Sequence, residues 1–93
     1  MDLVYIEWDD AEDFSANGSA WASQQEAEEF SKKVYIVRSV GWVVKKTRHY
    51  LSIASDHDPN HGNYGTLRKV PRKMIKRLDI LSIPQKEERL PEA

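Results

Sequence analysis

The 93-residue chain contains no cysteine and no long apolar run. The first absence excludes disulfide bonds and thiolate-bound metals, and it fits a reducing compartment. The second argues against a transmembrane helix, which needs about 20 consecutive apolar residues. The start of the chain, MDLVYIEWDD, is acidic and lacks the basic region that opens a signal peptide. We therefore expect a cytoplasmic protein with no membrane partner.

Sequence signatures of catalysis and of cofactor binding are also missing. The chain has neither of the phosphate loops GxxxxGKS and GxGxxG, and none of its serines lies in the GxSxG turn of hydrolases. A single domain of this size has room for one small core and little more. We therefore expect no enzyme activity and no cofactor.

Lysine and arginine are absent from residues 1–31, which contain nine acidic residues. Residues 32–83 contain twelve basic and three acidic residues, and residues 84–93 contain two basic and three acidic residues. The net charge of −1 therefore conceals a strong division. Three interpretations remain open. The two parts neutralise each other within the fold, the basic part binds an anion such as nucleic acid, or the acidic part imitates nucleic acid and occupies another protein.

Hydrophobic periodicity predicts a mainly β chain. Strands are predicted at residues 3–8, 34–47, 50–55, 66–70 and 75–81. Ser23 and Glu26 have the spacing of a capping box and predict a short helix over residues 23–30. Residues 71–74 suit one 3₁₀ turn. We expect the long second strand to bend at residues 39–41, because a glycine inside a strand often marks a bulge or a sharp coil of the sheet.

This succession of strands, with a single 3₁₀ turn before the last one, predicts a small SH3-like or Sm-like five-stranded barrel. Barrel closure removes the exposed sheet edges that a small β protein otherwise has to protect. Residues 1–83 form one domain in this prediction. It consists of an acidic strand–loop–helix segment (1–31) and a basic barrel core (32–83), and residues 84–93 form a flexible tail.

Three aromatic residues of the acidic segment are predicted to attach it to the core. Phe14 and Trp21 are the expected anchors of the loop, and Phe30 is expected to point inward from the helix. A helix this short is marginal on its own and needs tertiary support.

Residues 56–65, DHDPNHGNYG, gather carboxylates, histidines and glycines between the third and fourth predicted strands. Their start resembles a calcium loop, but His61 stands where that loop needs glycine and Leu67 where it needs glutamate. We predict a solvated hairpin loop, and a loop that contacts a ligand is one alternative.

A transition-metal site in the same stretch is the other alternative. Its ligands would be His57 and His61, with Asp56 or Asp58 as the third. Histidines four residues apart face the same way only on a helix, and the proline and glycine of this stretch oppose one. We therefore predict no metal.

Seven basic residues are the candidate ligand contacts. They flank the first hairpin, the 3₁₀ turn and the start of the last strand: Lys45, Lys46, Arg48, Arg68, Arg72, Lys73 and Lys76. In a barrel of the predicted order, the last four lie close enough to share one patch. Tyr50 and Tyr64 are candidates to stack on bases or nucleotides. The alternative is that these residues form an ordinary solvated surface.

Three motifs resemble those of small tailed-phage and prophage proteins. They are the opening IEWDD (residues 6–10), the strand SVGWVVKKT (39–47) and the turn VPRK (70–73). The resemblance covers residues 5–81, and its motifs are structural, so it implies no functional residues. It implies a phage origin and a role on some component of the host cell, in whose cytoplasm the protein would act.

The sequence thus predicts a non-enzymatic binding module with two candidate targets. The leading one is an anionic ligand, nucleic acid or a nucleotide, bound by the basic face. The alternative is a host protein, captured or inhibited through the acidic surface of residues 9–13 and 26–29. A third interpretation, sequestration of a small nucleotide between subunits, depends on the oligomeric state, which the sequence does not determine.

Overall fold

The computed structural model describes residues 1–11 and 18–84, and this part of the chain is mainly β. Its elements follow in the order β1 (Leu3–Asp9), α1 (Gln24–Lys32), β2 (Ile36–Lys46), β3 (Tyr50–Asp58), β4 (Asn63–Pro71), η1 (Arg72–Met74) and β5 (Ile75–Leu81). The predicted five strands, the helix and the 3₁₀ turn before the last strand are confirmed. Phe14 and the tail from residue 85 lie outside the described residues. In the part described, no helix is long and apolar enough to cross a membrane.

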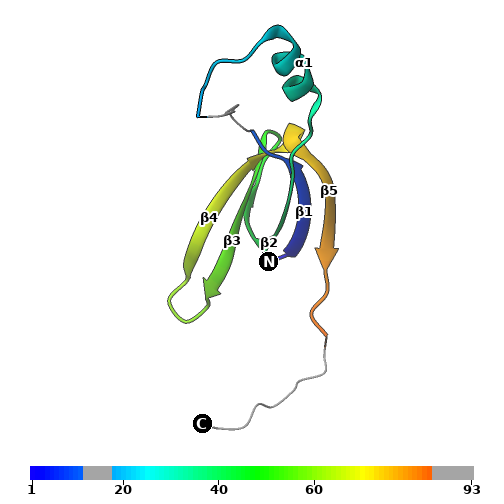
Figure 1. Ribbon diagram of the computed structural model, residues 1–93. Helices are drawn as coiled ribbons and strands as arrows, with labels where there is room; N and C mark the ends of the chain where they lie inside the picture. Colours follow the sequence, from blue (N-terminus) through cyan, green and yellow to red (C-terminus); the bar gives the residue numbers. More distant parts are fainter. Residues whose placement is uncertain (12–17, 85–93) are drawn as a thin grey trace, which may run out of the picture.

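The five strands form one antiparallel sheet in the order β4-β3-β2-β1-β5 (Figure 1). Trp42 of β2 pairs with both β1 and β3, so this strand passes from one partner to the other beside the expected bend. The edge strands β4 and β5 are joined through η1. Among the described residues they are not paired with each other, so the sheet is open.

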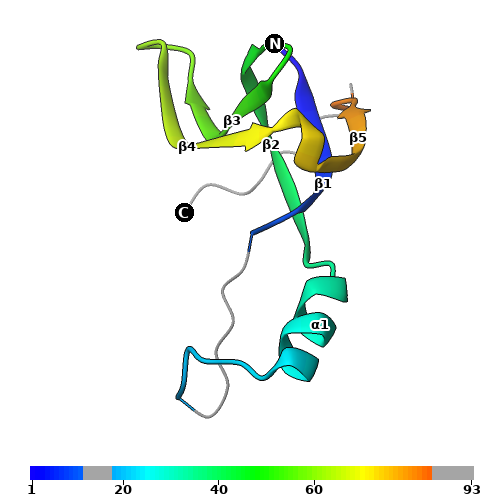
Figure 2. The same cartoon turned by 90° about the horizontal axis from the view of Figure 1, so that it is seen from above.

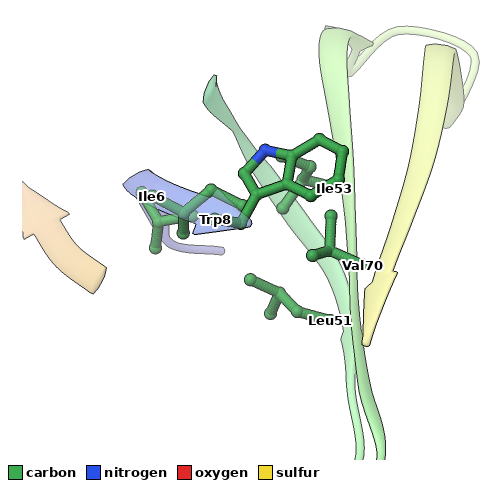
Figure 3. Packing of buried hydrophobic residues seen from close by; sticks show 6 residues of the cluster. Ile6, Trp8, Leu51, Ile53 and Val70 are labelled. Atoms are coloured by element: carbon green, nitrogen blue, oxygen red, sulfur yellow. The ribbon is translucent and has the colours of Figure 1, made fainter. Parts of the chain in front are cut away.

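The core lies on one face of this sheet. Alternation along β1 buries Val4, Ile6 and Trp8, as the sequence predicts. Their partners on β3 and β4 are Leu51, Ile53 and Val70 (Figure 3). The sheet is therefore curled, because side chains of β1 meet those of β3 and β4. Burying one such side chain contributes roughly 1.5–3 kcal/mol.

Gly41 marks a close contact between strands and not a bulge. A Cβ atom at this position would lie 3.0 Å from the carbonyl oxygen of Ala54 and 3.0 Å from Cβ of Ile53. The register of β2 against β3 shifts later, at Val44. The pairing of β2 with β1 runs from Ile36 to Trp42 without a register shift, so of the two alternatives at residues 39–41, a bulge or a sharp coil of the sheet, the bulge is wrong.

The capping box at the start of α1 is confirmed. The hydroxyl of Ser23 accepts a hydrogen bond from the backbone N–H of Glu26, and the Glu26 carboxylate accepts one from the N–H of Ser23, both at 3.1 Å. No residue of α1 is buried. In two perpendicular views the helix stands beyond the end of the sheet (Figures 1 and 2). Its fold therefore depends on its own hydrogen bonds more than on packing.

The prediction that Trp21 anchors the acidic segment is wrong, because this residue is 89% exposed. The inner face of the sheet is already filled by the aromatic side chain of Trp8, and α1 lies away from that face. Phe30, which was expected to point inward, is half-buried.

Residues 56–65 are mostly strand and not loop. β3 extends to Asp58 and β4 begins at Asn63, so only four residues turn the chain. His57 and Tyr64 lie opposite each other near this end of the hairpin, and their ring centroids are 4.8 Å apart. The sequence prediction ended the strands too early because polar side chains weaken the alternation by which strands are recognised.

Candidate anion-binding site

The seven predicted basic contacts lie on four elements and one turn. Lys45 and Lys46 end β2, Arg48 lies in the β2–β3 turn, Arg68 in β4, Arg72 and Lys73 in η1, and Lys76 in β5. All seven are exposed. None of them forms an ion pair with another described residue. Their charges are therefore not neutralised within the described part of the chain.

Three of these residues line one pocket, between the end of β2, the start of β3, η1 and β5. The pocket has a volume of about 220 Å³, and Lys46, Arg72 and Lys76 lie on its wall together with Arg77. The remaining lining residues are aliphatic: Leu51, Ile75 and Leu78. Within residues 1–11 and 18–84, no carboxylate lines this pocket. Cations beside a low-dielectric wall attract an anion more strongly than cations surrounded by water.

The bulge at Val44 brings Lys46 to the pocket. Val43 packs against the core opposite Ile53, so regular alternation would aim Lys45 at the same face two residues later. The extra residue shifts the register by one. Lys46 therefore lies opposite the core residue Leu51 and reaches the pocket in place of Lys45.

A second register shift places Lys76. Glu7 of β1 pairs with Arg77, but the next residue, Trp8, pairs with Ile75. Lys76 is thus the extra residue of a bulge in β5. Neighbouring side chains of a regular strand point to opposite faces, whereas Lys76 and Arg77 both line the pocket. Sequence reasoning missed Arg77 for this reason, because alternation assigns the two residues to different faces.

Arg72 fixes η1 against the β2–β3 turn. Its guanidinium donates to the carbonyl oxygen of Thr47 at 3.1 Å, and its backbone N–H donates to that of His49 at 2.9 Å. The turn is closed by Thr47, whose side-chain oxygen accepts from the N–H groups of His49 and Tyr50 at 3.2 and 3.0 Å. The position of Arg72 is thereby set, and its other guanidinium N–H groups can donate to a ligand.

The charge of the pocket comes mainly from Lys46, Arg72 and Lys76. Arg77 is bonded to Asp79, with distances of 3.0 Å from Nε and 2.9 Å from the terminal nitrogen to one carboxylate oxygen. This contact raises the pKa of Arg77 above its ordinary value. The side chains of Lys46 and Lys76 form no hydrogen bond or ion pair with any described residue.

The other predicted contacts do not line this pocket. They are Lys45, Arg48, Lys73 and Arg68. The guanidinium of Arg68 lies 5.6 Å from the ring centroid of Trp8, at a different place on the sheet. Lys69 places its ammonium 4.7 Å from the ring centroid of Tyr50, and Tyr64 stacks on the histidine opposite it. Each of these tyrosines therefore already has a partner on its ring.

The tip of the β3–β4 hairpin uses its polar groups within the turn. Asp58 accepts from the backbone N–H of Asn60 at 3.0 Å, and its other carboxylate oxygen lies 2.7 Å from Nδ1 of His61. The hydrogen bond from His61 lowers the pKa of Asp58. Gly62 closes the turn with φ +69°, a conformation that favours glycine. Within residues 1–11 and 18–84, no cluster of three or more histidines and carboxylates could hold a metal ion.

β1 of the acidic part pairs with β2 and β5 of the basic part, and Glu7 of β1 forms an ion pair across that junction. Its carboxylate lies 3.6 Å from Nε of Arg38 and accepts a hydrogen bond from the hydroxyl of Tyr5 at 2.7 Å, which raises the pKa of Tyr5. The carboxylate of Glu28 on α1 accepts instead from Gln24 of the same helix. Ion pairing between the two parts is therefore limited, among the described residues, to this single contact.

Comparison of the chain with protein-family models, with curated proteins and with solved structures found no match. The chemistry that the pocket can perform follows from its own side chains. Lysine and arginine donate charged hydrogen bonds to phosphate and carboxylate oxygens. The aliphatic wall can contact the apolar part of a ligand that carries such a group.

Proposed function

We propose that the chain is a non-enzymatic module that binds an anionic ligand, nucleic acid or a nucleotide. The site is the pocket of Lys46, Arg72, Lys76 and Arg77. The observation behind this proposal is that four cations and, among the described residues, no carboxylate line one pocket, and that the side chains of the two lysines have no hydrogen bond or ion pair with any of these residues. A volume of about 220 Å³ is small for a whole drug-sized ligand. The pocket therefore takes one phosphate with its sugar, as part of a longer strand or of a single nucleotide.

The fold is in keeping with this proposal. The strand order β4-β3-β2-β1-β5 and the 3₁₀ turn between β4 and β5 are those expected of an SH3-like or Sm-like barrel. We therefore also propose that the chain has an SH3-like or Sm-like fold, and the curled sheet supports this proposal. The phage origin inferred from the sequence motifs stays a prediction.

Fluorescence anisotropy of labelled oligonucleotides, single- and double-stranded, tests the proposal. We expect binding whose affinity falls steeply with salt. Four cationic contacts to a single strand give a slope of about −3 in the logarithm of affinity against the logarithm of salt concentration. The double variant Lys46→Gln/Lys76→Gln should make this slope less steep by about 1.4.

The matched control is Lys32→Gln/Lys33→Gln. It removes the same charge from the end of α1, where neither residue lines the pocket. We expect this control to keep most of the affinity. Equal losses in the two double variants would show that the attraction is general and not a property of the pocket. Absence of binding at low salt would overturn the proposal outright.

A second candidate function is capture of a host protein through the acidic segment. The observation that favours it is the exposure of apolar side chains on either side of α1. Trp21 is 89% exposed, Val34 62% and Tyr35 53%. Aromatic residues are enriched in protein interfaces, so exposed aromatic side chains favour a binding surface here. Together with the carboxylates of α1, they form a surface suited to a partner that offers basic and apolar groups.

Pull-down from a bacterial lysate tests this second function. The informative variant combines Trp21→Ala with Glu28→Lys and Glu29→Lys, which leaves the capping box intact. A partner that this variant loses and that Lys46→Gln/Lys76→Gln retains would assign binding to the acidic segment. A partner retained by both variants would contradict the assignment.

A further inference from the structure

A second pocket, distinct from the one above, opens between β2, β3 and β4. It has a volume of about 250 Å³ and shares no lining residue with the first. Its polar groups come from two arginines, Arg38 and Arg68, and from three hydroxyl side chains, Ser39, Ser55 and Thr66. Among the described residues, no carboxylate lines this pocket either. Five side chains that can donate hydrogen bonds, two of them charged, therefore surround one small space.

Core contacts hold two of these side chains in place. The guanidinium of Arg68 lies 5.6 Å from the ring centroid of Trp8, a favourable distance for a cation above an aromatic ring. The indole N–H of Trp8 donates to the hydroxyl oxygen of Ser39 at 3.1 Å. Ser39 acts as acceptor in that bond, so its own hydrogen can be donated to a ligand. Trp8 thus fixes a donor and a cation on the same pocket.

Arg38 keeps most of its donors free. Its Nε lies 3.6 Å from Glu7, which is long for a hydrogen bond, and its side chain is 76% exposed. Arg68 has no ion pair among the described residues. The two arginines therefore bring two positive charges to the pocket. Among the described residues, only Arg38 has a carboxylate nearby, that of Glu7.

The backbone at Thr66 is strained. Its φ of +53° lies in the left-handed region, and no other non-glycine residue of the described chain has a positive φ. The left-handed conformation costs a β-branched residue more conformational energy than it costs glycine. Residues strained in this way are found most often at functional sites. Stability alone would favour glycine at this position. A threonine here keeps a hydroxyl on the pocket.

We propose that this second pocket binds a dianionic phosphate group. Two guanidinium groups match its charge, and hydroxyls on different strands can donate to a tetrahedral set of oxygens. A carboxylate is planar, and one bidentate arginine satisfies it. The proposal does not depend on the function proposed for the first pocket, because the two sites have no residue in common.

Amide chemical shifts in a two-dimensional NMR spectrum test this site at constant ionic strength. Inorganic phosphate, adenosine monophosphate and adenosine are the three probes, and chloride is the balancing anion. We expect both phosphate-bearing probes to shift residues 38–39, 55 and 66–68, and adenosine to leave them unchanged. Shifts from the nucleotide alone would identify a nucleotide phosphate as the ligand, and shifts from both would identify a general phosphate site. Absence of shifts at these residues with every probe would overturn the proposal.

Four variants separate this site from the first pocket and from general charge effects. Arg68→Gln and Arg38→Gln should each weaken phosphate affinity by about tenfold, the effect of losing one charged hydrogen bond. Arg48→Gln removes the same charge from a turn residue that lines neither pocket, and Lys46→Gln/Lys76→Gln alters only the first pocket. Both should leave the shifts intact. Shifts that survive Arg68→Gln and Arg38→Gln alike would overturn the proposal.

Thr66→Gly distinguishes a ligand contact from a structural role. Glycine relieves the left-handed strain, so we expect the melting temperature to hold or rise. Phosphate affinity should nevertheless fall severalfold, because the hydroxyl is lost. Unchanged affinity in a folded Thr66→Gly protein would show that Thr66 does not contact the phosphate. The left-handed backbone at this residue would then not be explained by ligand binding.

Discussion

The Nδ1 atom of His61 lies 2.7 Å from a carboxylate oxygen of Asp58 across the tip of the β3–β4 hairpin. An ionised carboxylate can only accept, so Nδ1 carries the hydrogen. The other carboxylate oxygen of Asp58 accepts from the backbone N–H of Asn60 at 3.0 Å, so two donors stabilise the charged form of this side chain. The folded state therefore binds a proton at Asp58 less readily than the unfolded state does.

A pH dependence follows from this pair. Because the pKa of Asp58 is lowered in the folded state, the stability that it adds is present above the unfolded pKa of about 3.9. That stability is lost as the pH falls through the lower, folded pKa. We expect His61→Ala to raise the pKa of Asp58 toward its ordinary value, measured by NMR titration of the side-chain carboxyl carbon. His49→Ala, in the β2–β3 turn, is the control, and an unchanged pKa in His61→Ala would contradict the assignment.

Ile6→Ala should be among the most destabilising single changes in the chain. Ile6 is fully buried at the centre of the core, and truncation of a buried isoleucine costs about 2–5 kcal/mol. Urea unfolding measures the loss. Ile80→Ala is the matched control, because Ile80 is 62% exposed on β5 and its truncation should change the free energy of unfolding by less than about 0.5 kcal/mol. Equal losses in the two variants would contradict the position of the core.

Gly41→Ala should destabilise the sheet by about 1–3 kcal/mol, because the new Cβ would overlap the backbone of β3. Gly65→Ala tests whether the effect is specific. A Cβ at Gly65 would meet only the side chain of Asp56, at 3.3 Å, and that exposed side chain can move aside. We expect little change there. Similar unfolding midpoints for the two variants would show that the close contact at Gly41 does not limit the strand.

Ser23→Ala should melt α1 without melting the sheet. The substitution removes one side of the capping box, worth about 1 kcal/mol, from a helix that has no buried residue. Amide hydrogen exchange should therefore accelerate in residues 24–32 and stay unchanged in β1 to β5. Gln25→Ala, on the same helix, is the control. Faster exchange across the sheet in Ser23→Ala would mean that the helix supports the core.

Parts of this structure could be predicted because they depend on neighbouring residues alone. The alternation of Val4, Ile6 and Trp8 identifies a strand with one buried face, and Ser23 with Glu26 identifies the start of a helix. Both signals are contained in a few consecutive positions. The succession of the five strands along the chain, with the 3₁₀ turn before β5, could be predicted in the same way.

Other parts depend on which strand lies alongside. Lys46 reaches the first pocket because a bulge in β2 precedes it, and Lys76 reaches it because it is itself the extra residue of a bulge in β5. The position of a bulge depends on the neighbouring strand, which a sequence pattern does not identify. The exposure of Trp21 likewise depends on a distant part of the fold. A tryptophan is usually buried, but burial needs a free surface on the core, and Trp8 already occupies it.

The hairpin tip also provides a single chemical handle. It lies at the end of the sheet away from α1 and η1 (Figure 1), and the side chain of Asn60 is exposed there. Because the chain has no cysteine, Asn60→Cys would introduce its only thiol. Asn60 lines neither pocket, so a dye or a tether attached there through maleimide would leave both open. The protein could then be immobilised in one orientation, with the pocket of Lys46, Arg72 and Lys76 facing the solution.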